Sequence, residues 1–203
     1  MNFFEIFERV KRRLWSQRSI LLLVRPAGKT LDESKRKPSC VEFRPVTEDN
    51  IFDCGAFEDA NRYVPIYRDF LSRDGYVHFG YLDGQCVFRH VIEAVDALFW
   101  EGYPFLRAEK GEKLHYVHYG FCSPKARGKG CHSESLFFMA EKCSNVDLYA
   151  MVLPDNYASL KGCFRAGFEL QSLITVKHRF FRRMLLEQVL SSEEKAEYES
   201  ACL

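Results

Sequence analysis

Hydrophobic and polar residues alternate along several segments of the chain, and this pattern predicts β-strands. The clearest example is a hairpin, in which Tyr76–Leu82 and Gln85–Val95 flank the dipeptide Asp83-Gly84. That dipeptide suits a type I′ turn, because both of its positions need a positive φ. Further strands are expected at residues 19–25, 41–45, 114–122 and 147–152, with two more between residues 168 and 186.

Helical periodicity occupies the intervals between these strands. Helices are expected at residues 47–57, with Thr47 as N-cap, at residues 59–73, interrupted near Pro65, and at residues 133–143 and 157–166. Residues 97–111 are rich in aromatic side chains and are expected to form a loop. From residue 40 the order is strand, two helices, three strands, helix, strand, helix and two strands, which predicts a mixed α/β (α+β) sheet and not a doubly wound one.

The beginning of the chain has a different pattern. Residues 2–15 place six apolar side chains at helical spacing and charged residues opposite them, which predicts an amphipathic helix. This helix either packs on the domain as a lid or makes a weak contact with a membrane surface through its basic end. Residues 26–38 predict a linker. The expected organisation is therefore residues 1–38 (helix, strand and linker), 39–190 (main domain) and 191–203 (tail).

The charge of the chain is balanced, with 29 basic and 28 acidic residues among 203, so it gives no global reason to bind nucleic acid. Its eight cysteines are widely spaced without a zinc-type pattern, and no metal site is expected. The longest apolar run, residues 20–24, is too short to span a bilayer. These features favour a cytoplasmic protein with free thiols, acting as a monomer or homodimer.

The segment with the clearest chemistry runs from Tyr119 to Leu136 and reads YGFCSPKARGKGCHSESL. A strand ends near Pro124, a basic loop follows, and two glycines lead into a helix. A helix start leaves about four backbone N–H groups without intrahelical acceptors, and the helix dipole adds positive partial charge. Glycine lets an anion approach the backbone, while Lys125, Arg127 and Lys129 add charge. The segment predicts a phosphate or pyrophosphate site, with a solvated basic loop as the alternative.

The spacing of the glycines and basic residues in this segment differs from that of a P-loop motif and from that of a dinucleotide-binding motif. RGKGCH at residues 127–132, preceded by Cys122-Ser123-Pro124, instead resembles the R/Q-x-x-G-x-G/A signature of GNAT acyltransferases. A second resemblance lies downstream, where the N-x-x-A/S and G-F pattern of that family is matched by Asn156, Ser159, Gly167 and Phe168. The order of predicted elements is similar to the same fold from about residue 40 to 186. The resemblance implies a mixed, mostly antiparallel GNAT sheet flanked by helices, with acetyl-CoA or another acyl-CoA as co-substrate.

The resemblance also implies which residues hold the co-substrate. Strand 114–122 and the strand before Asn156 would splay apart to admit the pantetheine arm, and amides between Gly128 and Ser133 would hold the pyrophosphate. The full expected set is Phe121, Cys122, Lys125, Arg127, Gly128, Lys129, Gly130, Cys131, His132, Ser133, Asn156 and Ser159. His132 stands where the signature has Gly or Ala, so its side chain fits only if it points away from the co-substrate. Lys161 and Arg165 either approach the nucleotide end or are solvated.

Acyl transfer to an amine needs a group that accepts the proton of the amine. His118 is the expected base because histidine titrates near neutral pH, and Glu93 and Asp96 are alternatives whose pKa values would need raising by burial. Cys163 stands where many relatives carry a tyrosine that protonates the leaving thiolate, and a thiol is able to donate that proton. Met151 replaces the catalytic glutamate of one branch of the family. The alternative for His118 and Cys163 is a structural role.

The expected function is N-acyl transfer of an acetyl or short acyl group from acyl-CoA to a primary amine of a small molecule. The N-terminal helix and the N-x-x-S variant of the second motif are similar to uncharacterised GNAT proteins associated with surface-polysaccharide synthesis, which implies an amino-sugar acceptor. The aromatic residues of segment 99–105 are candidates for lining the acceptor pocket. Two alternatives remain, a non-catalytic module that binds acyl-CoA and regulates a partner, and a protein N-acetyltransferase.

Overall fold

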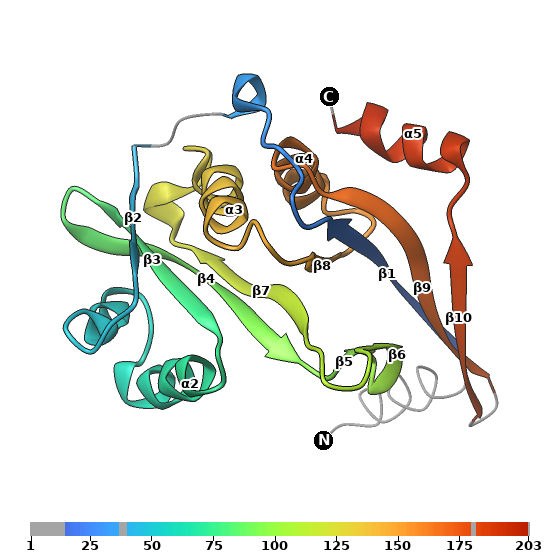
Figure 1. Ribbon diagram of the computed structural model, residues 1–203, viewed down its shortest axis with the longest axis horizontal. Coiled ribbons are helices and arrows are strands. Elements are labelled where there is room, and N and C mark those ends of the chain that lie inside the picture. Colours follow the sequence, from blue (N-terminus) through green and yellow to red (C-terminus); the bar gives the residue numbers. More distant parts are fainter. Residues whose placement is uncertain (1–14, 37–39, 180–181, 203) are drawn as a thin grey trace, which may run out of the picture.

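An eight-stranded mixed sheet forms the centre of the protein, and residues 15–36, 40–179 and 182–202 are described in this computed structural model (Figure 1). The strand order is β10-β9-β1-β8-β7-β4-β3-β2. Of the pairs in this sheet, β7 and β8 are parallel and the others are antiparallel, which confirms the predicted sheet. The strand bounds are β1 (Trp15–Arg25), β2 (Glu42–Pro45), β3 (Tyr76–Leu82), β4 (Gln85–Val95), β7 (Leu114–Cys122), β8 (Leu148–Val152), β9 (Glu169–Arg179) and β10 (Arg182–Val189).

Helices cover both faces of the sheet (Figure 1). Helices α3 (Cys131–Lys142) and α4 (Tyr157–Arg165) lie on one face, which we call the α3 face. The opposite, α2 face carries helix α2 (Ala60–Ser72), the 3₁₀ helix η2 (Ile51–Ala56) and a small hairpin of β5 (Ala97–Trp100) and β6 (Tyr103–Arg107). Helix α5 (Ser192–Ala201) lies beside α4, and short 3₁₀ turns occur at η1 (Glu33–Lys35) and η3 (Pro124–Ala126). In the described part of the chain, no helix has the length and apolarity needed to cross a membrane.

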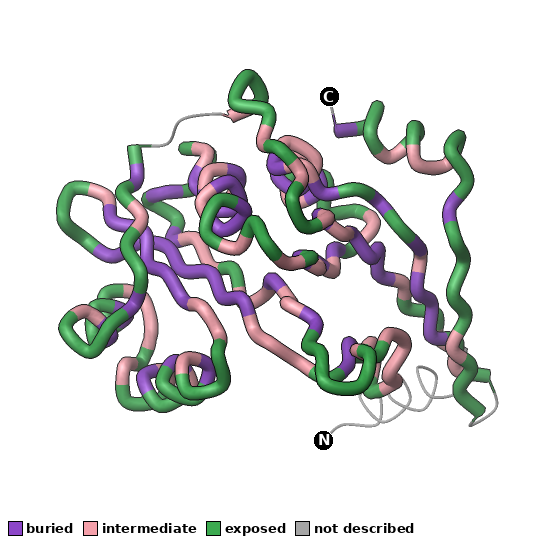
Figure 2. Tube along the Cα trace, viewed as in Figure 1, coloured by how far each residue is buried: buried purple, intermediate pink, exposed green. Residues whose placement is uncertain are grey.

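Alternation along the strands divides the core between the two faces. On β3, Val77 and Phe79 pack against α2 and η2, whereas His78 faces α3. The α3 face buries a larger cluster around Leu136, Phe137 and other apolar side chains of the two helices and the central strands. Figure 2 shows this concentration of buried residues in the central strands, while β10 is exposed along nearly its whole length. Burying each large apolar side chain contributes about 1.5–3 kcal/mol, so these two layers supply most of the driving force for the fold.

Several predicted elements agree closely with the structure. The hairpin of β3 and β4 has its predicted bounds, and the turn has positive φ at Asp83 (50°) and Gly84 (76°), as a type I′ turn requires. The strand predicted at residues 114–122 is β7. Helix α3 begins two residues earlier than predicted, at Cys131, because Gly130 adopts the left-handed conformation and serves as the N-cap.

Other predictions were wrong. Residues 47–57 contain a 3₁₀ helix over Ile51–Ala56 and not a longer helix from Thr47. The loop predicted at residues 97–111 contains the β5–β6 hairpin, and the tail predicted at residues 191–203 contains α5. The signal for α5 was present, because Ser191 and Glu194 form a capping box. Trp15, predicted to end the N-terminal helix, begins β1, and the rest of that predicted helix lies outside the described residues.

Strand β1 lies inside the sheet, between β9 and β8. It is antiparallel to both, and Leu21 pairs with Val152 of β8 and Leu173 of β9. The strand is fully buried at its centre, where Leu21 and Leu23 are 0% exposed. The sheet therefore runs across the boundary expected after residue 38, and residues 15–25 contribute to the same core as the main domain.

A buried ion pair links η2 and α2 to the middle of the sheet. The guanidinium of Arg89 on β4 lies 2.5 Å from Glu58 Oε1 and also donates to the carbonyl of Tyr119 on β7. The second carboxylate oxygen of Glu58 accepts from the hydroxyl of Tyr67. The side chains of Arg89 and Glu58 are 8% and 6% exposed, so each charge depends on the other for its stabilisation.

We expect Glu58→Ala to lower the free energy of unfolding by about 3–5 kcal/mol, because the Arg89 charge would stay buried without its partner. Glu48→Ala is the matched control, since it removes an exposed pair with Arg68 (67% and 49% exposed) and is expected to cost less than about 1 kcal/mol. Urea unfolding followed by fluorescence measures both. Equal losses in the two variants would contradict the structural role of the buried pair.

Candidate active site

Strands β7 and β8 separate within the sheet. They are paired at three positions only, from His115 with Leu148 to Val117 with Ala150. Beyond Val117, β7 bulges away, since Tyr119 has a φ of 58° and the register with β4 shifts between Arg89 and Val91. A bulge adds a residue to one strand and bends it, so the rest of β7 diverges from β8.

A cleft of about 390 Å³ lies where the two strands diverge. Its lining includes His90, His132 and Cys163 from the α3 face, and Tyr116 and His118 from the α2 face. The cleft therefore passes between the strands and connects the two faces of the sheet. Six of the predicted site residues line it, namely His118, Phe121, Cys122, His132, Ser159 and Cys163.

The start of α3 lies beside this cleft and has an uncapped helix N-terminus. Gly128 and Gly130 have φ of 75° and 78°, in the left-handed region that favours glycine. The first helical bond runs from Glu134 N to Gly130 O (3.0 Å), and no side chain caps the helix. The N–H groups of His132 and Ser133 come before Glu134 in the helix, so they have no acceptor within it. The Ser133 hydroxyl is buried without a hydrogen-bond partner among the described residues.

His132 points into the protein. A Cβ atom on Gly162 of α4 would lie 2.9 Å from His132 Cδ2, so the imidazole occupies the space that this glycine leaves. Its ring centroid is 5.2 Å from that of His90 on β4. Burial lowers the pKa of His132 to about 4, which keeps the ring neutral at pH 7. A side chain larger than Gly or Ala is accommodated here because α4 carries no side chain at Gly162.

His118 and Glu93, which were predicted as separate candidates, lie together. His118 Nε2 is 3.2 Å from Glu93 Oε2, in an orientation that does not form a hydrogen bond, and Arg73 is 2.9 Å from the other oxygen of Glu93. The His118 ring stacks on Tyr116 (centroids 4.6 Å apart) and packs edge-on against Phe70. Burial, together with the positive charge of Arg89, lowers the pKa of His118 to about 4. The imidazole is therefore neutral at pH 7 and able to accept a proton, beside a carboxylate that favours the imidazolium.

Cys163 lines the cleft from α4 and is 2% exposed. Burial raises the pKa of its thiol to about 12. The thiol therefore keeps its proton at neutral pH, but it is a weaker acid than a free thiol with a pKa near 8.5. Proton donation from Cys163 to a leaving thiolate would be uphill in free energy.

The structure gives other predicted residues different surroundings. Lys125 lines a separate hollow with Asp53 at the β3–β4 turn. Arg127 Nε donates to the carbonyl of Cys122 (3.3 Å), and Cys131 is buried and donates to Ala126 O (3.2 Å). Lys129 is exposed, and the side chain of Asn156 accepts from Ser159 N and caps α4. Asp96 is exposed and pairs with Lys113.

The aromatic residues of segment 99–105 do not gather at the cleft. Trp100 and Phe105 pack beneath β1 and β9, and Trp100 Nε1 donates to Arg18 O (3.2 Å).

His90 and Tyr116 line the cleft but were not among the predicted site residues. The only sequence signal for these two residues was the alternation of a buried strand. Ordinary core residues show the same alternation, so it does not mark a site residue.

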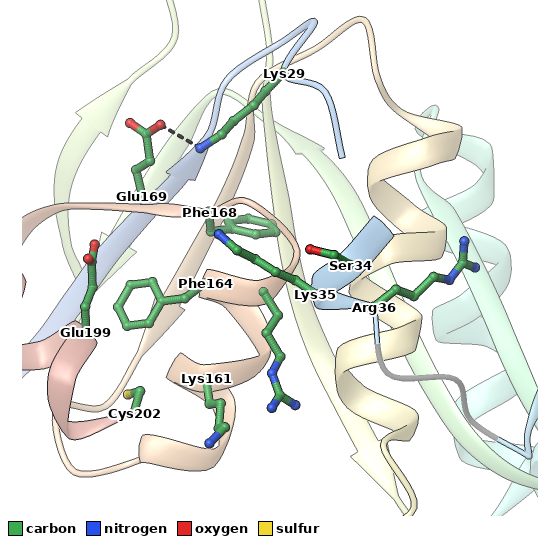
Figure 3. A pocket seen from close by; sticks show the side chains of 11 residues that line it. Lys29, Ser34, Lys35, Arg36, Lys161, Phe164, Phe168, Glu169, Glu199 and Cys202 are labelled. Carbon is green, nitrogen blue, oxygen red and sulfur yellow. Dashed lines mark hydrogen bonds and ion pairs between the residues drawn. The ribbon is translucent and has the colours of Figure 1, made fainter. Parts of the chain in front are cut away.

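A larger hollow of about 660 Å³ lies on the other side of α4, between that helix, α5 and η1 (Figure 3). It is lined by Lys161 and Arg165 of α4, so these residues do not face the cleft. Two of its basic side chains are already paired, Lys29 with Glu169 (2.6 Å) and Arg36 with Glu134 (2.6 Å). None of the predicted catalytic or cofactor-binding residues lines it. The cleft between β7 and β8 is therefore the candidate active site.

All eight cysteines lie in the described residues and are free thiols. No three His, Cys, Asp or Glu side chains gather as metal ligands within residues 15–36, 40–179 and 182–202.

No protein-family model and no curated protein matches the chain. Solved structures do resemble it. A GNAT-family acetyltransferase from Colwellia psychrerythraea is 8% identical (TM-score 0.51, 92% of this chain and 62% of that one). A GCN5-related N-acetyltransferase-like protein from Streptococcus suis is 12% identical (TM-score 0.52, 85% and 66%). A conserved protein of unknown function from Staphylococcus epidermidis is 15% identical (TM-score 0.57, 93% and 69%).

These likenesses establish the fold. The chain has the GNAT acetyltransferase fold, as its sequence motifs implied. It spans between 62% and 69% of the length of the three structures named above.

The buried histidines predict how stability depends on pH. Native pKa values are lowered to about 3 for His78, to about 4 for His118 and His132, and well below the ordinary 6.5 for His90. Below pH 6.5 the unfolded chain binds protons that the native state does not bind. Stability is therefore retained above pH 6.5 and falls as the pH drops toward 4, by up to about 1.4 kcal/mol per pH unit for each histidine.

Denaturant unfolding of wild type and His132→Leu between pH 7 and 4.5 measures this slope. In His132→Leu the slope of stability against pH should be smaller by the contribution of about one proton. His178→Gln, at a partly exposed position on β9, serves as the control. A slope that is the same in wild type and His132→Leu would contradict a neutral buried His132.

Proposed function

We propose that the protein transfers an acyl group from acyl-CoA to an amine. The observation that carries the proposal is the cleft between β7 and β8, which joins an uncapped helix start on the α3 face to the His118–Glu93 pair on the α2 face. A passage through a sheet suits a long, narrow substrate arm. Its two ends would serve the two reactants, with the nucleotide on the α3 face and the acceptor on the α2 face.

The α3 face has the chemistry to hold the pyrophosphate. The N–H groups of His132 and Ser133, the unpaired Ser133 hydroxyl and the dipole of α3 all favour an anion at this helix start. Gly128 and Gly130 leave the backbone open to close approach, since a Cβ on Gly128 would meet no atom within 4 Å. Arg127 and Lys129 add charge at the surface.

The residues of the α2 face would carry the proton chemistry. A neutral amine attacks the thioester carbonyl carbon, a C–N bond forms, and the C–S bond breaks to release the thiolate. His118 accepts the proton that the amine nitrogen loses, and Glu93 stabilises the resulting imidazolium from 3.2 Å. Burial keeps His118 neutral before the reaction but also weakens it as a base, so the neighbouring Glu93 carboxylate has to favour the imidazolium when the proton is transferred.

The finer proposal concerns the acceptor. Aromatic side chains surround the α2-face end of the cleft, with Tyr116 and Tyr119 in its lining and Tyr63 of α2 next to Tyr119 (centroids 6.3 Å apart). Sugar rings pack well on aromatic faces, and this supports an amino sugar as the acceptor amine.

We expect Ser133→Ala to weaken CoA binding about tenfold, because it removes a buried donor at the pyrophosphate position. Ser172→Ala is the matched control, since Ser172 on β9 is also a buried serine whose hydroxyl has no partner among the described residues, but it lies on a strand and not at the start of α3. Isothermal titration calorimetry with CoA measures both. A wild-type protein that gives no binding heat and no shift in melting temperature with CoA would refute the proposed function.

We expect His118→Ala to lower kcat by about 100- to 10,000-fold, because the reaction loses its general base, while CoA affinity stays unchanged. His115→Ala on the same strand is the control, because His115 lines a different hollow beside Asp147. CoA release from acetyl-CoA is measured with amino sugars, polyamines and a peptide amine as acceptors. CoA binding without turnover on any acceptor would favour a regulatory acyl-CoA-binding module, and turnover with the peptide alone would favour a protein acetyltransferase.

A further inference from the structure

Two buried histidines and a serine form a connected chain next to the cleft, and the proposed mechanism does not use them. His78 Nε2 lies 2.8 Å from Ser135 Oγ, and His90 Nδ1 lies 2.9 Å from the same oxygen. Exposure is 0% for His78 and Ser135 and 3% for His90. The three residues come from β3, α3 and β4, so the tertiary structure brings them together.

The single proton of the Ser135 hydroxyl determines the tautomer of both rings. If Ser135 donates to His90 Nδ1, then His78 donates to Ser135 from Nε2, and His90 carries its proton on Nε2. In the reverse arrangement His78 would carry its proton on Nδ1, which is buried and has no partner among the described residues. Orphaned buried N–H donors are rarer than under-satisfied acceptors, so the first arrangement is favoured.

This arrangement directs an N–H donor toward the cleft. His90 lines the cleft together with Gly120 of the β7 bulge. A Cβ atom on Gly120 would lie 3.0 Å from His90 Nε2, so this nitrogen faces the space beside the glycine. Burial and the neighbouring His132 lower the pKa of His90 well below its ordinary value, which agrees with a neutral ring that has a single proton.

We propose that His90 is a catalytic hydrogen-bond donor, whose Nε2–H stabilises the negative charge that forms on the thioester carbonyl oxygen in the cleft. This role rests on the proposed acyl transfer. When the amine attacks, the carbonyl π electrons move to oxygen, and they return when the C–S bond breaks. His90 donates a hydrogen bond throughout and neither gains nor loses a proton. A neutral imidazole suits this task, because it donates without entering proton exchange.

Ser135 and His78 act through His90 and are positioning residues. Ser135 holds the tautomer of His90, and His78 holds the hydroxyl of Ser135. Neither of them lines the cleft.

Nuclear magnetic resonance of ¹⁵N-labelled histidines tests the tautomer directly and needs no acceptor. We expect His90 to be protonated on Nε2 in wild type and to become a mixture of tautomers in Ser135→Ala. We also expect acetyl-CoA to move the His90 Nε2–H resonance more than CoA does, because the two ligands share the pantetheine amides and only acetyl-CoA carries the thioester carbonyl. Protonation on Nδ1 in wild type, or equal shifts with both ligands, would overturn the proposal.

Kinetics provide the second test. We expect His90→Phe to lower kcat about 100- to 1,000-fold with unchanged CoA affinity, the loss typical of removing one such donor. His90→Gln, which keeps an N–H group at nearly the same reach, should recover part of that loss, and melting temperatures confirm that both variants fold. An unchanged kcat in His90→Phe would refute the role proposed for His90 and would leave the proposed function standing. A wild-type protein that does not bind CoA would refute both.

Discussion

The bulge in β7 at Tyr119 is the feature on which the rest of the site depends. It ends the pairing of β7 with β8 after Val117 and opens the cleft through the sheet. Arg89 donates to the Tyr119 carbonyl and is itself held by the buried carboxylate of Glu58. A strained backbone of this kind persists only where its surroundings determine it, and here a charge-assisted network provides that constraint. The ion pair that stabilises the α2 face therefore also shapes the cleft.

The two faces of the cleft divide the chemistry by their electrostatics. On the α3 face, a helix start that no side chain caps, with the Ser133 hydroxyl unpaired among the described residues, favours an anion, and the nearby rings of His90 and His132 are neutral. On the α2 face, His118 lies beside the carboxylate of Glu93, which is suited to stabilise a positive charge that forms on the imidazole. Burial keeps these rings neutral at pH 7. The cleft thus combines donors for negative charge with an acceptor for a proton.

Sequence reasoning predicted six of the residues that line the candidate cleft, and the signals it used are local. Gly128 and Gly130 before a helix led to the predicted anion site, and the alternation of β7 led to the prediction for His118. It did not single out His90, Ser135 and Glu58, which have hydrogen-bond partners 45, 45 and 31 residues away in the chain. It also assigned Lys125 to the co-substrate, whereas Lys125 lines a separate hollow at the β3–β4 turn. Charge and spacing along the chain do not reveal which way a loop side chain points.

By itself, the sequence determined the mixed sheet, the β3–β4 turn and the presence of a helix after the two glycines, because each follows from periodicity or from the φ preference of a few neighbouring residues. Only the tertiary structure decided that β1 lies between β9 and β8, that Glu93 faces His118, and that His132 fits against Gly162. These outcomes depend on packing between segments far apart in the chain. Such packing is selected by the fit of whole surfaces, and local sequence preferences do not encode it.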